Sequence, residues 1–409
     1  MITTLIAALT MVSPGSCCPG SVADARLSGL IEAAWQEQSK EDQKAAKAKQ
    51  AHEKDLKSDA EIGAKYAAEA DKQLKASTNQ EVIDRVNRIG QSLAEIANKT
   101  AVKVSWGDKR LNTYKYTFKV VEKPEVNAFS LPGGFIYVFD GLVKYVESDD
   151  ELAGVLAHEI AHASLRHLAT LERERSKLDL LTLPMILVSI VAGASGDGNT
   201  GAGVMTLTQL ITQANSSGWG LKAEESADYA GFQYMQKSGY DPVGALTFME
   251  KLARDQRAIE AIDWGIYRTH PPSRERASNL ERLLKDANLP IQRSKVATSF
   301  RALTVSKESG EVDIQFNGRN LLTLGGQDAK QRAEALVPKL NGFFDQVPDL
   351  FDVSMGPDGE IFWRREVLLQ VQPKDAEIQK ASVELATAGV LKSIKRELYL
   401  LAYRIWETR

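Results

Sequence analysis

Cysteine is nearly absent from this sequence: among 409 residues there are two, Cys17 and Cys18, adjacent to each other near the N-terminus. A disulfide framework or a cysteine-based zinc site in the folded body is therefore excluded. An excess of charge is also missing, because 51 Lys and Arg residues face 54 Asp and Glu residues and leave a formal net charge of -3. This balance gives no support to nucleic-acid binding, which needs a basic face, so no nucleic acid is expected as a partner. The length and the 43% content of hydrophobic residues are typical of a globular protein with two or three domains.

Long hydrophobic runs are rare as well. The first lies at residues 5–12, and an A-x-A cleavage pattern follows at residues 23–25. These features predict a secretory signal peptide over residues 1–25, and hence a periplasmic or secreted protein, although no basic residue precedes the run. The alternatives are lipid attachment at Cys17 or Cys18, or an apolar disordered tail.

The second apolar run lies at residues 178–194 and contains Asp179 and a central Pro184. It is shorter than the roughly 20 residues that cross a bilayer, and a glycine-rich break separates it from another apolar segment. The two segments predict a helical hairpin over residues 178–214 that is buried or acts as a lid, rather than a membrane span. Peripheral membrane association through this hairpin is a further hypothesis.

The texture of the sequence changes along the chain and predicts its organisation. Residues 26–76 are rich in Ala, Lys, Glu and Gln, which indicates a mostly solvated helical arm. Residues 77–296 combine amphipathic helices with strand patterns at residues 114–121 and 127–140. Residues 297–409 have the order strand-strand-helix twice, which predicts a small α+β domain of unknown role. The strands of this domain are expected at residues 303–316, 320–324, 351–355 and 360–371, and its helices at residues 328–344 and 375–406.

The motif that points to chemistry is His158-Glu159-Ile160-Ala161-His162, within a segment, residues 149–170, that has the pattern of a helix. Positions i and i+4 share one face of a helix, so both imidazoles can bind one metal ion. Glu159 is displaced by about 100° around the helix from His158, so it can take a proton from a metal-bound water without ligating the metal. The pattern predicts one zinc ion per chain, bound by His158 and His162, with Glu159 as the catalytic base.

A catalytic zinc needs a third protein ligand and one open position. A third histidine at metzincin spacing is missing, because the position six residues after His162 is a leucine and His167 is one residue out of phase. His167 is therefore interpreted as a structural or surface residue. The other common ligand is a Glu with an Asp four residues later, and after His162 only Glu224 has this spacing, with Asp228. We predict Glu224 as the third ligand, with Glu225 as the alternative, and Asp228 as the acceptor that orients a ligand imidazole.

Four segments occur in order along the chain: residues 127–138 (NAFSLPGGFIYV), 158–162 (HEIAH), 224–228 (EESAD) and 269–276 (THPPSRER). Together they resemble the HtpX/BepA/OMA-type metallopeptidases, relatives of the CAAX prenyl protease, and most closely their soluble periplasmic branch. The resemblance covers residues 60–290 and implies an α+β fold, with a zincin-like (gluzincin) peptidase domain that has a mainly helical body and a small mixed sheet. The C-terminal part departs from BepA, which has tetratricopeptide repeats there.

The resemblance also implies roles for two further segments. His270 falls on the family's T-H-P histidine, which lies near the zinc and either stabilises the oxyanion or occupies the open coordination site. The alternative for His270 is a plain histidine at a helix start. Asn127, Ala128, Phe129 and Ser130 fall on the family's edge strand above the active-site helix, where an extended peptide pairs through backbone hydrogen bonds. The alternative for these four residues is an ordinary internal strand.

These patterns predict a zinc-dependent metalloendopeptidase that hydrolyses peptide bonds in unfolded or misfolded envelope proteins, in the manner of a periplasmic quality-control protease. Its expected partners are extended or unfolded polypeptides. The alternative is a chaperone-like or binding protein whose zinc site is plugged by His270 and mainly structural. Glu159 favours the peptidase, because a structural zinc site has no use for a base.

Overall fold

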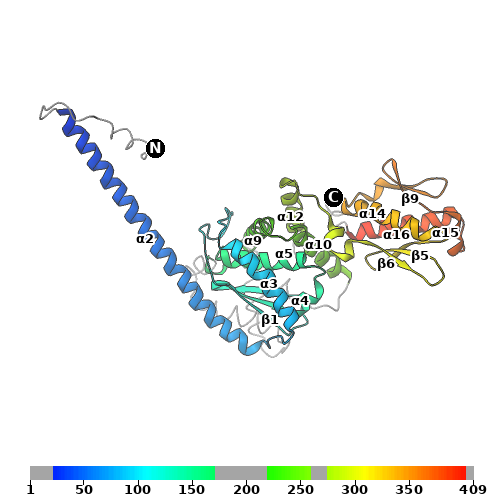
Figure 1. The fold of residues 1–409 in the computed structure, drawn as a ribbon, viewed down its shortest axis with the longest axis horizontal. Helices are drawn as coiled ribbons and strands as arrows, with labels where there is room; N and C mark the ends of the chain where they lie inside the picture. The colour runs from blue at the N-terminus through cyan, green and yellow to red at the C-terminus, as the bar shows by residue number, and fades with distance from the viewer. Residues whose placement is uncertain (1–21, 171–218, 259–273, 402–409) are drawn as a thin grey trace. The chain divides into compact units, whose positions relative to one another are not determined.

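The computed structural model of the chain describes residues 22–170, 219–258 and 274–401 (Figure 1). The chain divides into two compact units, Met1–Lys57 and Ser58–Arg409. None of the helices within the described ranges is long and apolar enough to cross a membrane. The predicted signal peptide up to residue 21 and the predicted hairpin at residues 178–214 lie outside the described residues.

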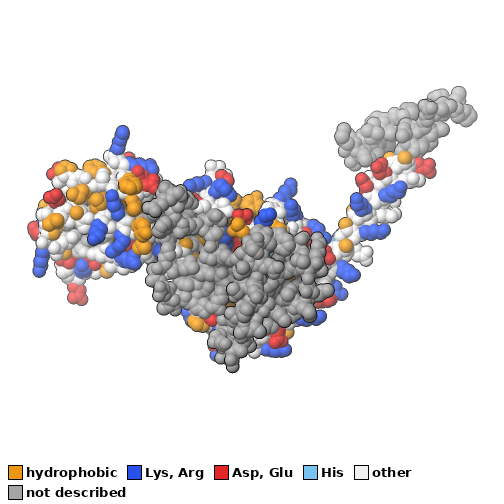
Figure 2. Space-filling view, turned by 180° about the vertical axis from the view of Figure 1, so that it is seen from behind, with side chains coloured by type: hydrophobic (Ala, Val, Ile, Leu, Met, Phe, Trp, Pro, Cys, Tyr) orange, Lys and Arg blue, Asp and Glu red, His pale blue; other side chains and the backbone are white. Residues whose placement is uncertain are grey.

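The predicted helical arm belongs to one long helix, α2 (Val22–Gln73). Residues 32–50 of this helix are all exposed, and positive and negative side chains are interspersed along its described part (Figure 2). From Ser58 onward the same helix belongs to the larger unit, where Ala67 and Ala70 are buried. The first part of α2 is thus a solvated helix, and its last turns are part of the folded body.

A small mixed sheet lies at the start of the larger unit. Its strands are β1 (Thr117–Val121), β2 (Ala128–Leu131) and β3 (Phe135–Phe139), in the order β1-β3-β2. Strand β1 runs parallel to β3, and β2 runs antiparallel to it. The strand expected from residue 114 begins only at Thr117, because its partner β3 begins at Phe135, which pairs with Thr117.

The last turns of α2 pack against this sheet. Ala67 and Leu74 share a buried cluster with Tyr137, whose hydroxyl donates a hydrogen bond to the carbonyl oxygen of Ala67 at 3.0 Å. The helix also approaches the short helical turn η1 (Pro132–Gly134) between β2 and β3. This approach is so close that a Cβ atom on Gly63 would lie 1.8 Å from the carbonyl oxygen of Pro132.

Helices form the rest of the body around the site. They are α3 (Gln80–Ala97), α4 (Asp140–Tyr145), α5 (Asp149–Ser164), α9 (Trp219–Gln236), α10 (Val243–Ala258), α12 (Arg274–Asp286), α13 (Arg293–Val296) and the short η2 (Thr298–Phe300). Helix α5 is central, because it contacts α3, α9 and α10 and is buried along nearly its whole length. Ser148 caps α5 by accepting a hydrogen bond from the N–H of Glu151 at 3.1 Å.

The helix predicted over residues 149–170 is interrupted, and the prediction of one continuous helix is wrong at this point. Helix α5 ends at Ser164, Arg166 has a φ of 54°, and helical turns resume at His167. The left-handed region is unfavourable for a residue with a side chain, so something must hold Arg166 there. Its buried guanidinium donates two hydrogen bonds to Asp59, at 2.5 and 2.9 Å. This tertiary contact is not visible in the local pattern.

The C-terminal part contains two three-stranded antiparallel sheets, each followed by helices. The first half consists of β4 (Ala302–Ser306), β5 (Val312–Phe316), β6 (Arg319–Leu324) and α14 (Ala329–Asp345). The second half consists of η3 (Leu350–Asp352), β7 (Val353–Met355), β8 (Glu360–Trp363), β9 (Glu366–Gln370), α15 (Pro373–Ile378) and α16 (Val383–Leu401). The sequence pattern predicts two strands per half, and the structure has three. The third arises because the chain reverses at Gly310 (φ 87°) and at Arg364 (φ 58°), so each long predicted strand is a hairpin.

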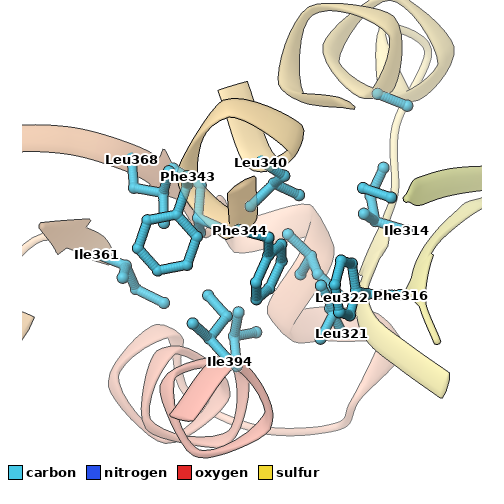
Figure 3. Packing of buried hydrophobic residues seen from close by; sticks show 14 of the residues in the cluster. Ile314, Phe316, Leu321, Leu322, Leu340, Phe343, Phe344, Ile361, Leu368 and Ile394 are labelled. Carbon is cyan, nitrogen blue, oxygen red and sulfur yellow. The ribbon is translucent and has the colours of Figure 1, made fainter. Parts of the chain in front are cut away.

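One hydrophobic core joins the two C-terminal halves (Figure 3). Phe344 of α14 stacks on Phe316 of β5 with ring centroids 3.9 Å apart, and Ile394 of α16 belongs to the same cluster. Arg293 of α13 ties this part to the helices described above: it donates two hydrogen bonds to Glu250 of α10, at 2.7 and 2.8 Å, and one to the carbonyl oxygen of Asp345 of α14 at 2.8 Å. The predicted α+β fold class, mainly helical with small sheets, is confirmed.

The contact between α2 and the turn η1 generates a prediction about Gly63. In a helix interior, alanine is usually favoured over glycine by about 1 kcal/mol. At Gly63 the added Cβ would collide with backbone, so we expect Gly63→Ala to lower the free energy of unfolding by about 1–3 kcal/mol. Gly342 of α14 is a matched control, because a Cβ there meets no atom within 4 Å and alanine should stabilise the protein. Urea unfolding of both variants gives the two signs, and stabilisation by Gly63→Ala would contradict the packing.

Candidate metal centre

His158 and His162 lie one turn apart on α5, and their side chains are 12% and 13% exposed. The regular helix between them directs both rings to one face, with centroids 4.6 Å apart. Their Nε2 atoms lie 3.0 Å from each other. Two neutral ring nitrogens at this distance either share a proton or face a common cation.

Glu224 of α9 brings the third donor to this point. One of its carboxylate oxygens lies 3.3 Å from Nε2 of His158, and the other lies 3.3 Å from Nε2 of His162. Donor atoms of the three residues all lie within 4.8 Å of one another, and among the described residues this is the one group of three such side chains that could hold a metal ion. The structure therefore brings together the three side chains that the sequence singled out as ligands.

The packing of α9 on α5 explains this convergence. Glu224, Asp228 and Gly231 follow the i, i+4, i+7 spacing and share one face of α9. A Cβ atom on Gly231 would lie 3.2 Å from the backbone of Ala157, so glycine lets the two helices approach closely. Gly231 lies beside Ala157 whereas Glu224 reaches His162, so α9 runs antiparallel to α5 where they cross.

The donor set fits a small divalent cation such as zinc. Zinc binds imidazole nitrogen and carboxylate oxygen at about 2.0–2.2 Å, and the edge of a tetrahedron of that size is about 3.3–3.6 Å. The separation of the two histidine Nε2 atoms, 3.0 Å, is close to that edge, and one donor atom from each of the three residues lies within 4.8 Å of the others. The three side chains are therefore close enough to hold one ion.

Asp228 lies where a partner for a ligand ring was expected. Its Oδ1 is 2.9 Å from Nδ1 of His158, so a proton on Nδ1 leaves Nε2 of the same ring available to a metal. Burial by itself would raise the pKa of Asp228, but the adjacent Arg276 lowers it to about 2. Burial likewise opposes a charge on His158, yet the carboxylates of Asp228 and Glu224 outweigh it and raise the pKa of His158. The site thus attracts positive charge.

Arg276 of α12 is a site residue that the sequence argument missed. Its Nε and Nη2 donate to the two oxygens of Asp228 at 2.7 and 2.8 Å, and its Nη1 lies 2.9 Å from Oε2 of Glu224. These carboxylates raise the pKa of Arg276, so the guanidinium stays charged although it is buried. Its position at the end of the THPPSRER segment was the available signal. Arg276 holds Oε2 of Glu224, the oxygen that lies 3.3 Å from His158, whereas Oε1 faces His162.

Of the predicted residues Glu159, His167 and His270, the structure describes the first two. Glu159 is 1% exposed and follows His158 on α5. His270, by contrast, lies outside the described residues. His167, interpreted from sequence as structural or surface, is buried, with its Nδ1 2.9 Å from Nδ1 of His162. Burial lowers the pKa of His167 well below its usual value, and His162 lowers it further.

The predicted edge segment contains Asn127 and strand β2. Among the described strands β2 pairs only with β3, so one of its long sides is an edge of the sheet, and the strand contacts α5. The carbonyl oxygen of Asn127 accepts a hydrogen bond from the N–H of Phe139 at 3.0 Å. Because backbone direction alternates along a strand, Phe129 also faces β3, whereas Ala128 and Ser130 direct their backbone groups away from β3. Ala128 is fully buried there and Ser130 is half-buried.

Comparisons with known proteins agree with this site. Residues 87–284 match the model described as Peptidase family M48. The beta-barrel assembly-enhancing protease of Yersinia pestis is 29% identical over 263 residues, 63% of this chain and 46% of that protein. The protein of the same name from Escherichia coli (strain K12) is 30% identical over 239 residues, 58% of this chain and 45% of that protein. The mitochondrial metalloendopeptidase OMA1 of Schizosaccharomyces pombe is 30% identical over 187 residues, 45% of this chain and 51% of that protein.

The chain thus spans about half the length of the curated relatives that it matches. The family resemblance that the four sequence segments indicated is confirmed by these matches.

The cluster predicts that each chain binds one metal ion and that this binding depends on Glu224. We expect Glu224→Ala to weaken metal binding by more than the about 10–100-fold loss that removal of an outer-shell partner causes. Glu225→Ala is the matched control on the same helix, because Glu225 is not in the cluster. This variant should bind metal like the unmodified protein. Metal content by mass spectrometry and competition with a chelator measure both. Equal affinity of the two variants would remove Glu224 from the site.

Proposed function

Because residues 87–284 form a domain of peptidase family M48, we propose that this chain is a zinc-dependent metalloendopeptidase. The observation that supports the proposal is the cluster of His158, His162 and Glu224 with Glu159 on the same helix as the two histidines. A purely structural site would need the three donors but no additional carboxylate at that position.

The proposed reaction is hydrolysis of a peptide bond by water. His158, His162 and Glu224 would hold the zinc ion, which supplies Lewis acidity that acidifies water and polarises the scissile carbonyl group. Glu159 accepts a proton as the water oxygen attacks the carbonyl carbon, and passes it to the amine nitrogen as the C–N bond breaks. Asp228 and Arg276 keep His158 and Glu224 in place during these steps, through the close polar contacts described above.

We propose extended or unfolded polypeptides as the substrates. Among the described strands β2 pairs with β3 alone, so an added strand would pair along its other side at the half-buried Ser130, and β2 contacts the helix that carries the histidines. Pairing of this kind reads backbone more than side chains, so it favours chains without secondary structure of their own.

The compartment and the class of substrate protein are also part of the proposal. The apolar run and cleavage pattern at residues 1–25 favour export. Two relatives, from Yersinia pestis and Escherichia coli, carry the name beta-barrel assembly-enhancing protease. The name describes those two proteins. On both grounds we propose unfolded or misfolded envelope proteins as substrates and the periplasm as the compartment.

Glu159 provides the direct test of the mechanism. Glutamine has nearly the same shape but cannot accept a proton, so Glu159→Gln should retain its metal and fold and lose about 100-fold or more of its activity. Cleavage of unfolded casein, with and without a chelator, measures the activity, and metal content of the same sample shows that the site is intact. A metal-loaded Glu159→Gln protein with full activity would exclude Glu159 as the base.

His270, which the family resemblance places near the zinc, has two proposed roles with opposite consequences. If His270 stabilises the oxyanion, His270→Ala should lower activity by about 100–1,000-fold, the effect of losing one such donor. If it plugs the fourth position, the same change should raise proteolysis, because zinc with four protein ligands has no place for water. Casein cleavage decides the sign, and unchanged activity together with unchanged metal affinity would leave His270 a structural residue.

A further inference from the structure

We propose that His167 is a positioning residue that orients the ligand His162 through a hydrogen bond between the two rings. This inference rests on the proposed function, because it concerns how the predicted metal ligand is held. The family motif and the ligand spacing do not point to His167, which the sequence pattern treats as structural.

The geometry of the ring contact is specific. Nδ1 of His162 lies 2.9 Å from Nδ1 of His167, and the two rings are nearly perpendicular, at 83°, with centroids 4.8 Å apart. Nε2 of His162 faces Glu224 and His158 in the donor cluster. If Nε2 of His162 binds the metal, its Nδ1 carries the ring proton and donates it to Nδ1 of His167. The two ligand histidines would then be oriented by different groups: a carboxylate for His158 and a neutral imidazole for His162.

A regular helix could not make this contact. His167 is five residues after His162, and in a continuous helix it would be rotated by about 140° away from it. The chain instead leaves the helix after Ser164, and the left-handed residue Arg166 redirects it before helical turns resume. The N–H of Thr170 then bonds to the carbonyl oxygen of Arg166 at 2.8 Å, which closes the first new turn.

Two carboxylates hold Arg166 in this conformation. Asp59, from the last part of α2, accepts from Nε and Nη2 of Arg166, and it also accepts from the hydroxyl of Tyr114 at 2.7 Å. Asp108 accepts from Nη1 of Arg166 at 3.1 Å, and its own N–H donates to the carbonyl oxygen of Leu165 at 2.8 Å. Both carboxylates therefore hold the turn that brings His167 to His162.

The surroundings of His167 leave it little freedom. The ring lies 5.1 Å from the ring of Trp106, centroid to centroid. On the same side Gly107 has a φ of 105°, and a Cβ there would lie 2.9 Å from Cδ2 of His167. A ring that is buried and enclosed in this way can fix the rotation of His162, as outer-shell partners fix metal-binding histidines in general.

Three substitutions of His167, which differ in the reach and the polarity of the new side chain, test this role. Asparagine can place an amide atom close to where Nδ1 of histidine lies, whereas glutamine places it one carbon further out. We expect His167→Asn to bind zinc within a few-fold of the unmodified protein, and His167→Gln and His167→Leu to bind it about 10–100-fold more weakly. Tyr234→Phe is the control, because it removes a buried hydrogen bond to Ser164 (2.8 Å) at the same end of α5 without touching a ligand.

The full-length chain is used in a Glu159→Gln background, so that self-cleavage does not reduce the sample. Zinc affinity is measured by competition with a chromophoric chelator, the fold by thermal unfolding, and the ligand geometry by the absorption spectrum of the Co²⁺ form. We expect the spectrum to change for His167→Gln and His167→Leu and to stay unchanged for Tyr234→Phe, even where the melting temperatures of the variants are equally lowered. If the leucine variant does not fold, the asparagine and glutamine pair decides.

Two outcomes overturn the inference in distinguishable ways. If the unmodified protein takes up zinc and the glutamine variant binds it equally well, His167 is only a packing residue and the proposed function is unaffected. If the unmodified protein itself takes up no zinc, the proposed function fails and the inference falls with it.

Discussion

The close antiparallel contact between α5 and α9 is the constraint on which the rest of the site depends. Gly231 allows it, because a Cβ at that position would already be 3.2 Å from the backbone of α5. With the backbones this close, Glu224 lies 3.3 Å from both histidine Nε2 atoms. Helix α10 also packs closely on the other end of α5, because a Cβ on Gly244 of α10 would lie 2.2 Å from the carbonyl oxygen of Asp150. Rigid helices rather than loops therefore set the donor positions, which favours a preformed site.

Buried charge is the second feature that organises this region. Ionised groups are costly inside a protein unless they are paired, and the carboxylates here are paired in different ways. The positive charge of Arg276 compensates one of the three negative charges that Asp228, Glu224 and Glu159 carry when they are ionised. Two negative charges are left if all three carboxylates are ionised, and a divalent cation at the histidines would balance them. The same need for charge compensation explains why Asp59 and Arg166 occur as a buried pair next to the site.

The functional unit extends beyond the segment that matches the family model. That match begins at residue 87. Before it, Asp59 of α2 binds Arg166, which lies directly after α5, and Gly63 of α2 contacts the turn between β2 and β3. At the other end, Arg293 binds both Glu250 and the backbone of Asp345 in the C-terminal part. The last turns of α2 therefore belong to the structure that surrounds the candidate metal centre.

Local periodicity and spacing determined a large part of this protein from its sequence: the long helix, the strands of the mixed sheet, the α+β class and the shared face of His158 and His162. The i, i+4 rule also singled out Glu224 with Asp228, because a helix repeats its face every turn whatever surrounds it. Only the tertiary structure decided the break at Arg166, the position of His167 and the contacts of Arg276. Each depends on partners distant in sequence, such as Asp59 for Arg166 and Asp228 for Arg276. A left-handed residue held by a remote carboxylate leaves no periodic signal, because the energy that holds it there comes from a contact that forms only when the chain is folded.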